Sequence, residues 1–538
     1  MLPRIRSVIV LAVAAGVAWG CGGERVTTSQ APEAKGQAGR PLGKLAFGGT
    51  NEQAAVLARV QRGDADVSGV TVAFARSVSG RPANYEWSGT TDAHGRVRVV
   101  IGGPGVGGYY RARAVQAGSV LGSWSSIPVN DGYETKVDLP VDGSALVTGT
   151  AARDVVTIGE GQRVQIRTVL AHVVVPSVSD WARYSAELAI RDYGPIHGHE
   201  VELGEPIDGM CSQDGGIASA ERIIANPQVI GVIGTLCSGS AVAASPLLGA
   251  AGLVMISPAN TSPVLTSDLT GNPGSDYHPG YFRTANNDLY QGQAVADFAY
   301  NELGLRRVVS IDDGDPYTMG LTGAFGNAFS ALGGEIPATA RIEKGETDMT
   351  GVLSDFVAAE PDGIFFPLFI AEGSPFAEQV KNVDGLNEAT LLTDAALLLS
   401  EFLGTPQSEG VYFAGPEPVH GENVNIATGK NGDAVLAEIQ TIHGGTHTNP
   451  FWAHAYDATT LLLSAINAVA VADGGKLYID RVALRAEVGA TAGFPGLIGE
   501  LTCDGFGDCG TGRVNIYHHT DTSIVDPAQL PVVYRFEP

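Results

Sequence analysis

The chain has 538 residues, of which 44% are hydrophobic and 17% are charged. Apolar content of this size can fill large buried cores, which excludes a wholly disordered chain, and the length predicts more than one domain. The formal net charge is −25. Because this charge repels phosphate backbones and anionic lipid headgroups, it argues against nucleic-acid binding.

The first twenty residues are predicted to be an export signal that is not part of the fold. Arg4 and Arg6 precede an apolar run over residues 8–17, which is too short to span a bilayer. Cys21 follows the small Gly20, so the segment resembles the lipobox of bacterial lipoproteins, in which the cysteine is acylated. An ordinary secretory signal is the alternative, and both export the protein. We expect this lipid to be the only membrane attachment.

Cysteine use agrees with export. With Cys21 set aside for lipid, four cysteines remain, in two pairs close in sequence: Cys211 and Cys237, and Cys503 and Cys509. An even number of this kind suits disulfides in an oxidising compartment.

Two segments precede the main body. Residues 21–48 are rich in small and polar residues and are predicted to be a flexible tether. Residues 49–152 alternate apolar and polar positions, as from Val70 to Phe74, which predicts a small all-β sandwich. This module resembles bacterial Ig-like or carboxypeptidase-regulatory-like modules. Residues 103–108 contain GxGxxG, but we interpret them as a hairpin loop because they join two strands.

From about residue 163 the pattern alternates strands with helices, which predicts parallel sheets with helices on both faces and two similar lobes. Strands are predicted over 164–175, 201–203, 229–234, 253–257, 307–311, 363–369, 514–517 and 532–536. Helices are predicted from Ser179 as an N-cap, and around 217–224, 321–332, 376–383 and 452–471.

Catalytic and metal-binding motifs are scarce. No nucleophile elbow, Walker A loop, HExxH or CxxC is present. His518 and His519 near the late cysteines suggest a metal site, but a structural disulfide with exposed histidines is favoured. Asp504 and Asp508 suggest a calcium loop, but a plain turn is favoured. We therefore predict no enzyme activity, no metal and no cofactor.

Two predicted buried strands end in small polar turns, Ser238-Gly239-Ser240 and Ala259-Asn260-Thr261. Ligands bind at this carboxyl edge of open α/β sheets. Free N–H groups at the start of a helix, with the hydroxyls of Ser238 and Ser240, suit a carboxylate. Ala259 can offer its carbonyl and Thr261 its hydroxyl. The alternative is that these residues serve only turn geometry and helix capping.

Residues 163–538 resemble the leucine/isoleucine/valine-binding protein family, the branched-chain amino-acid branch of the type I periplasmic binding proteins. The resemblance rests on separated motifs: Cys211 and Cys237 at the family's disulfide spacing, Leu236-Cys237-Ser238, Ile256-Ser257-Pro258, Phe282-Arg283-Thr284, Gln291-Gly292, Asp312-Asp313 with Tyr317 and Gly320, and residues 494–499. It implies two lobes joined by three crossings that close on a ligand. Lobe I is expected over 163–290 and 420–500, and lobe II over 291–419 and 501–538.

The resemblance also implies roles for single residues. Ser238 and Ser240 match the turn that holds the ligand's carboxylate. Ala259 and Thr261 match the strand end that contacts the carboxylate and the ammonium. Tyr317 matches an aromatic residue of the second lobe.

Other positions implied by the resemblance depart from the family pattern. Phe369, or Ile370 beside it, lies near a further aromatic position. The first loop lacks the family's glycine-rich, tyrosine-bearing segment, and Trp181 is expected to replace part of it.

One departure concerns charge. The acid that accepts the ligand's ammonium in the family aligns near Ala395, and the candidates to replace it are Asp394 and Glu372. A strand-end turn is the alternative role of Asp394. Since a buried ammonium needs a carboxylate partner, an α-amino acid is the wrong ligand if neither acid reaches the cleft.

The leading functional hypothesis is a lipid-anchored, extracytoplasmic protein that captures an amino acid or a related small carboxylate by hinge closure. Its expected partner is an ABC permease. A ligand sensor that signals to a membrane partner is the first alternative. An envelope interaction protein that uses the β module is the second.

Overall fold

The computed structural model describes residues 38–44, 53–62, 65–66, 69–76, 87–94, 96–102, 108–116, 119–129, 133–140, 155–444 and 449–538. The chain divides into two compact units, residues 1–147 and 148–538. The predicted signal segment and Cys21 lie outside the described residues. Within the described ranges, no helix is both long and apolar enough to cross a membrane.

The first unit contains two sheets that enclose a core. One sheet has the order β1-β9-β2-β3, with β6 also pairing with β2, and the other has the order β5-β4-β7-β8. Val56 and Ala58 of β2 are buried with Val72 and Phe74 of β4, because alternate residues of each strand face inward. The strands are β1 (Ala38–Lys44), β2 (Gln53–Arg62), β3 (Ala65–Asp66), β4 (Thr71–Arg76), β5 (Trp87–Thr90), β6 (Arg96–Gly102), β7 (Gly108–Gln116), β8 (Ser119–Val129) and β9 (Tyr133–Pro140).

Two predictions for this region need correction. Strand β1 lies inside the segment predicted as a tether, and it pairs with β9, so the β unit includes residues from Ala38. Strands flank the GxGxxG segment as predicted, but β6 and β7 belong to different sheets. The segment therefore connects two sheets and is not the turn of a hairpin; its residues 103–107 lie outside the described ranges. The Ig-like resemblance stays a prediction.

The second unit begins, in its described part, with β10 (Val155–Ile158), which pairs with β23 (Lys476–Asp480) ahead of the predicted start at residue 163. A first large sheet follows, in which all strands are parallel and the order is β12-β11-β14-β15-β16, with β13 beside β11. Its strands are β11 (Val164–Leu170), β12 (Val201–Glu202), β13 (Ile207–Asp208), β14 (Val229–Gly234), β15 (Val254–Ser257) and β16 (Tyr281–Arg283).

Helices cover both faces of this first sheet because its strands carry apolar residues on both sides. Met255 packs with helices α2 (Gln213–Ile224) and α3 (Ser238–Ala250), whereas Val254 and Ile256 pack with α1 (Pro176–Tyr193) and α10 (Trp452–Val469). Helices α9 (Gly432–His443) and α11 (Arg481–Gly489) belong to the same core cluster as α1 and α10. The small sheet of β24 (Phe494–Gly496) and β25 (Gly499–Leu501) also belongs to it. The strand β22 (Val471–Asp473) pairs with β23.

The second large sheet has the order β18-β17-β19-β20-β21-β26-β27. Strand β26 is antiparallel to both of its neighbours, β21 and β27, and the other pairs are parallel. Its strands are β17 (Val308–Asp312), β18 (Thr339–Arg341), β19 (Gly363–Phe365), β20 (Thr390–Thr393), β21 (Tyr412–Gly415), β26 (Val514–His518) and β27 (Val532–Phe536). Phe365 packs with α5 (Pro316–Ala331), and α4 (Asp288–Asp297) lies in the same cluster. Ile364 packs on the opposite face with α6 (Thr350–Ala359) and α7 (Ile370–Val380). The short α8 (Ser400–Leu403) also lies on that face.

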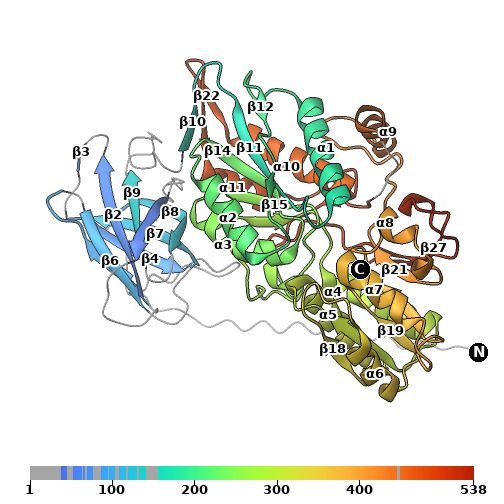
Figure 1. Ribbon diagram of the computed structural model, residues 1–538. Helices are drawn as coiled ribbons and strands as arrows, with labels where there is room; N and C mark the ends of the chain where they lie inside the picture. Colours follow the sequence, from blue (N-terminus) through green and yellow to red (C-terminus); the bar gives the residue numbers. More distant parts are fainter. Residues whose placement is uncertain are drawn as a thin grey trace, which may run out of the picture. The chain divides into compact units, whose positions relative to one another are not determined.

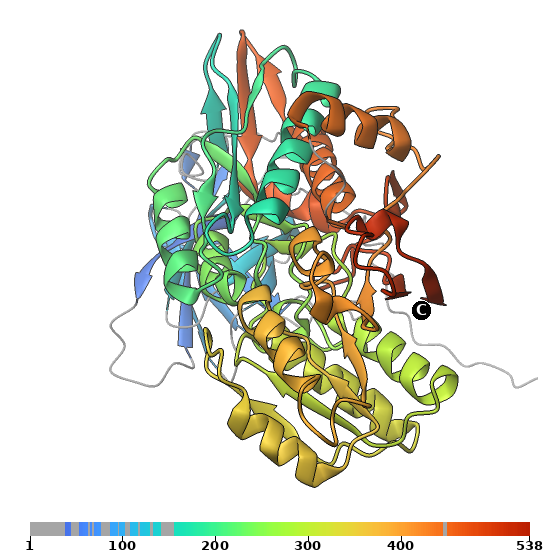
Figure 2. The ribbon, with the colours of Figure 1, turned by 45° about the vertical axis from the view of Figure 1, so that its right-hand side comes forward.

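The two sheets form the two lobes of a type I periplasmic binding protein fold, which confirms the predicted fold class. Figures 1 and 2 show the first sheet and its helices above the second. The chain passes between the lobes three times, after β16, after β21 and before β26.

Most predicted elements are present, but several local predictions were wrong. The strand predicted over 164–175 ends at Leu170, and the helix predicted over 452–471 ends at Val469, since Val471 begins β22. Ser179 does not cap a helix: α1 begins at Pro176, and the Ser179 hydroxyl accepts a hydrogen bond from the N–H of Ala171 at 3.0 Å. The strand predicted over 363–369 ends at Phe365, because the chain turns there toward α7 and the cleft.

Candidate ligand-binding site

A cavity of about 60 Å³ lies between the two lobes. Its wall is lined by Val175, Val178, Leu236, Cys237, Ser238, Ala259, Thr261, Gln291, Tyr317, Phe369, Ala395, Ala396, Leu399, Asn449 and Phe451. These residues come from both lobes, and no Asp, Glu, Lys or Arg is among them. The lining is therefore apolar over most of its area, with a few neutral polar groups.

The turn between β14 and α3 supplies one polar side of this cavity. Helix α3 begins at Ser238, and its N-cap residue Cys237 provides no side-chain hydrogen bond. Because the first N–H groups of a helix have no partner within the helix, they are available to an anion. The Ser238 side chain is 1% exposed, and its hydroxyl accepts a long hydrogen bond of 3.4 Å from the N–H of Ser262.

The turn after β15 lies beside the start of α3 and supplies Ala259 and Thr261 to the cavity wall. Thr261 is 2% exposed, and its hydroxyl faces the buried Asp288 carboxyl but makes no hydrogen bond of normal geometry. A buried hydroxyl without a well-formed hydrogen bond is costly unless a bound molecule supplies one. Thr261 therefore marks a point at which a ligand would bind.

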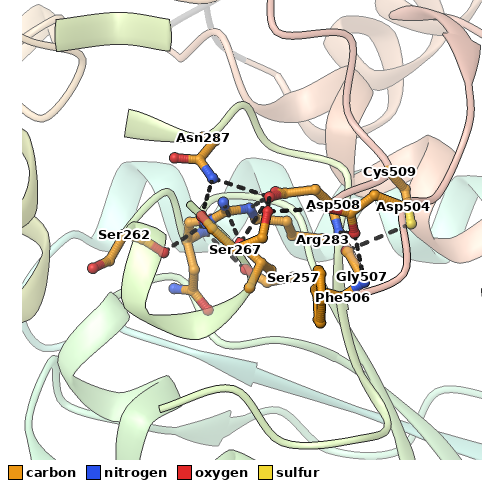
Figure 3. Close-up of polar contacts among 12 residues, drawn as sticks. Ser257, Ser262, Ser267, Arg283, Asn287, Asp504, Phe506, Gly507, Asp508 and Cys509 are labelled. Carbon is orange, nitrogen blue, oxygen red and sulfur yellow. Dashed lines mark hydrogen bonds and ion pairs between the residues drawn. The ribbon is translucent and has the colours of Figure 1, made fainter. Parts of the chain in front are cut away.

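A buried ion pair between Arg283 and Asp508, drawn in Figure 3, supports this turn. Arg283 is fully buried and makes an ion pair with Asp508, a residue of the late segment between the lobes. Its guanidinium also donates to the carbonyls of Ser262 at 2.8 Å and Asn260 at 3.4 Å. The predicted Phe282-Arg283-Thr284 motif thus fixes the backbone on both sides of Thr261.

The Asp508 carboxylate is itself satisfied by neighbours. It accepts hydrogen bonds from the Thr266 hydroxyl at 2.8 Å and from the Asn287 amide at 3.0 Å. Asp504 accepts from the N–H groups of Phe506 and Asp508, which is the geometry of a plain turn. The structure thus uses both aspartates in protein contacts, in line with the favoured prediction.

Five of the predicted ligand-binding residues line the cavity together, namely Ser238, Ala259, Thr261, Tyr317 and Phe369. Ser240 does not, because its hydroxyl donates to the carbonyl of Gly209 at 2.7 Å and accepts from the N–H of Ser212 at 3.1 Å. It therefore fixes the loop before α2.

Three further predicted residues also lie outside the wall. Trp181 is buried in the core of the first lobe, so it does not replace the family's loop. Asn260 turns its amide oxygen to the Thr235 and Tyr281 hydroxyls. Gly239 faces the second lobe, where an added Cβ would lie 2.7 Å from an Asp315 oxygen.

Neither candidate acid reaches the cavity wall. Asp394 is fully buried and accepts hydrogen bonds from the Tyr317 hydroxyl and from the N–H of Ala396. Burial raises the pKa of Asp394 to about 7. Glu372 accepts from the N–H of Gly345, and burial raises its pKa as well. The Tyr317 ring lines the cavity while its hydroxyl is held by Asp394.

Some lining residues were not predicted as ligand contacts. Gln291 belongs to a motif quoted for the family resemblance but was given no role. Asn449 and Phe451 precede α10, and nothing local in their sequence marks them, since they reach the cleft only through the folding of a segment far along the chain.

The cysteines form the pairs Cys211–Cys237 and Cys503–Cys509. His519 is buried, contrary to the predicted exposure, and its two ring nitrogens contact the carbonyls of Ser408 and Ile524. Across the described ranges, no cluster of three or more His, Cys, Asp or Glu residues could hold a metal ion.

The fold and this cleft define a class of proteins in which two lobes close around a solute. A profile of the family described as "Periplasmic binding protein" matches residues 175–512, more than half of the chain. The chain belongs to this family, whose members bind solutes and are not enzymes, and the family implies an extracytoplasmic location.

Comparisons with individual proteins agree with this family assignment. An "Amino acid binding protein" of Pseudomonas aeruginosa is 25% identical over 53% of this chain and 71% of its own length. The structure of a leucine binding protein, LivK, from Thermotoga maritima covers 70% of this chain and 99% of its own, with 23% identity and a TM-score of 0.58. A solute binding protein from R. palustris in complex with benzoate covers 70% and 97%, with 17% identity and a TM-score of 0.57.

Proposed function

We propose that this protein is lipid-anchored at Cys21, captures a small solute that carries a carboxylate, and delivers it to an ABC permease. The observation that carries the proposal is the cavity between the lobes, where the start of α3 and the hydroxyls of Ser238 and Thr261 meet. These groups donate hydrogen bonds and offer the positive end of a helix dipole, which together suit a carboxylate.

Closure follows from the shape of the site. Residues of both lobes line the cavity, so a ligand that contacts both favours the closed arrangement. We propose residues 163–290 with 420–500, extended at the start by β10, and 291–419 with 501–538, as the limits of the two lobes. The leucine and the benzoate named for two proteins of similar fold share one group, a carboxylate. This shared group supports the choice of ligand class.

The test is a thermal-shift screen of the purified chain with amino acids and with small carboxylic acids. Replacing both Ser238→Ala and Thr261→Ala is expected to abolish the ligand-induced rise in Tm while the Tm without ligand stays nearly constant. A ligand at 100 times its Kd stabilises the folded state by about 2.7 kcal/mol, which such a screen detects easily.

The matched control is Ser330→Ala, a change to an exposed serine on α5. This variant should retain the full shift. An undiminished shift in the double variant would overturn the assigned pocket.

A further inference from the structure

We propose that the ligand of this pocket is a small monocarboxylate with an apolar body and no ammonium group, such as a branched aliphatic or aromatic carboxylic acid. The inference rests on the proposed function and specifies the chemistry that the same site selects. An α-amino acid differs from such a ligand by one positive charge, so the decisive question is what the pocket offers that charge.

The polar side of the pocket favours negative charge only. Helix α3 presents its unpaired N–H groups there, and the Ser238 and Thr261 hydroxyls lie at the same end. The Thr261 hydroxyl is buried beside the Asp288 carboxyl, makes no hydrogen bond of normal geometry there, and can donate to a ligand's carboxylate oxygen. This end repels an ammonium through the helix dipole and attracts a carboxylate.

No negative charge on the wall compensates an ammonium. All fifteen lining residues are uncharged. Ala395 lines the wall at the place where the resemblance implies an acid, and the neighbouring Asp394 turns both carboxyl oxygens to Tyr317 and Ala396. The remaining polar contacts are neutral, so they cannot offset the cost of removing an ammonium from water.

The rest of the wall is apolar on both lobes. Val175, Val178 and Leu236 belong to the first lobe, and Phe369 and Leu399 belong to the second. Aliphatic and aromatic side chains of this kind bury a hydrocarbon body but satisfy no further polar group. A ligand with one polar end and one apolar body matches this division.

The first experiment is isothermal titration of the purified full chain with two matched pairs: leucine with 4-methylpentanoate, and phenylalanine with 3-phenylpropanoate. Each pair shares a carbon skeleton and a carboxylate and differs in the amino group. We expect the acid to bind at least tenfold more tightly than its amino acid. Tighter binding of either amino acid would overturn the inference and leave the proposed function intact. If no carboxylate of any kind binds, the proposed function fails as well.

The second experiment restores the missing charge. Ala395→Asp places a carboxylate on the wall, and it should weaken binding of the acid at least tenfold and reduce or reverse the preference over the amino acid. Ala395→Asn is the control for side-chain size, and Ala486→Asp, at an exposed position of α11, is the control for net charge. If Ala395→Asp does not fold, judged by circular dichroism, Ala396→Asp on the same wall replaces it. An unchanged preference in the folded acidic variant would contradict the inference.

Discussion

The direction of each side chain, more than its identity, determines which of the predicted residues reach the pocket. Ser238 and Ser240 are two positions apart at the start of α3, and a helix rotates about 100° per residue, so their side chains point to opposite sides. Ser238 therefore lines the cavity while Ser240 holds the loop before α2. This difference follows from helix geometry and could have been predicted from the sequence.

The orientation of Asp394 could not have been predicted in this way. Its carboxyl group, just after β20, is directed by the Tyr317 hydroxyl, which lies 77 positions away in the sequence, on α5. A contact between residues so distant in sequence appears only once both elements are placed in the fold. Two candidate acids could therefore be named from the sequence, but not whether either one faces the cavity.

A buried acid beside the crossing between the lobes predicts a dependence of stability on pH. Asp288 is fully buried, and this burial raises its pKa to about 8. An unfolded aspartate loses its proton near pH 4, so between about pH 4 and 8 the folded state binds more protons than the unfolded state. This contribution to stability is complete below pH 4 and is lost as the pH rises toward 8.

Replacing Asp288→Asn should remove this dependence, because the amide stays neutral at every pH. The fall in the free energy of unfolding between pH 5 and 7 should become shallower by up to about 1.4 kcal/mol per pH unit, measured by urea denaturation. Asp355→Asn, the same substitution at an exposed position of α6, should keep the original slope. Equal slopes in the two variants would show that Asp288 is ionised in the folded protein.

At the scale of elements, two strands were predicted with the bounds they have in the structure, one fully buried and one at the edge of its sheet. The strand predicted over 229–234 and the late strand over 532–536 have the predicted bounds, since a continuous or alternating apolar run specifies them directly. Helix starts were less accurate. Helix α5 begins at Pro316, five residues before the predicted start, because the Asp315 side chain caps it by accepting from the N–H of Tyr317.

The disulfides join elements over loops of different length, which predicts unequal effects on stability. Cys211 and Cys237 are 26 positions apart and connect the starts of α2 and α3, whereas Cys503 and Cys509 are 6 apart. On the chain-entropy relation, replacing the first pair by alanine should cost roughly 3.5 kcal/mol of unfolding free energy, and replacing the second roughly 2 kcal/mol.

Equilibrium denaturation of the two double variants, each compared with the wild type under oxidising conditions, measures this order. The reverse order would mean that packing around the late cysteines outweighs loop entropy.

At the scale of the whole molecule, hydrogen bonds join the two lobes on the rim of the cleft. The Lys344 ammonium, on the second lobe, donates to the carbonyl of Cys211 on the first lobe at 3.0 Å and pairs with Asp315 at 2.7 Å. The Ser262 hydroxyl donates across the cleft to the carbonyl of Pro316 at 2.8 Å. The two-lobed plan was predictable from two successive runs of strand and helix, but these bridging contacts were not, because they depend on loop conformations.

Removing the lysine bridge should favour the open arrangement. Lys344→Met is expected to increase the rate of ligand dissociation by about three- to tenfold, since a partly exposed charged hydrogen bond contributes about 1 kcal/mol. Stopped-flow displacement with the tightest-binding carboxylate measures this rate. Lys381→Met is the control, because that lysine donates to Glu409 within its own lobe. An unaltered dissociation rate would show that the bridge does not stabilise closure.

The pairing of Arg283 with Asp508 spans 225 positions of the sequence. Because the chain is synthesised from its N-terminus, Arg283 is made long before Asp508. Until Asp508 is present, packing the Arg283 guanidinium against the Ser262 carbonyl would leave an unpaired positive charge in the interior. The turn at Ser262 therefore takes its final form only after the segment around Asp508 has been made.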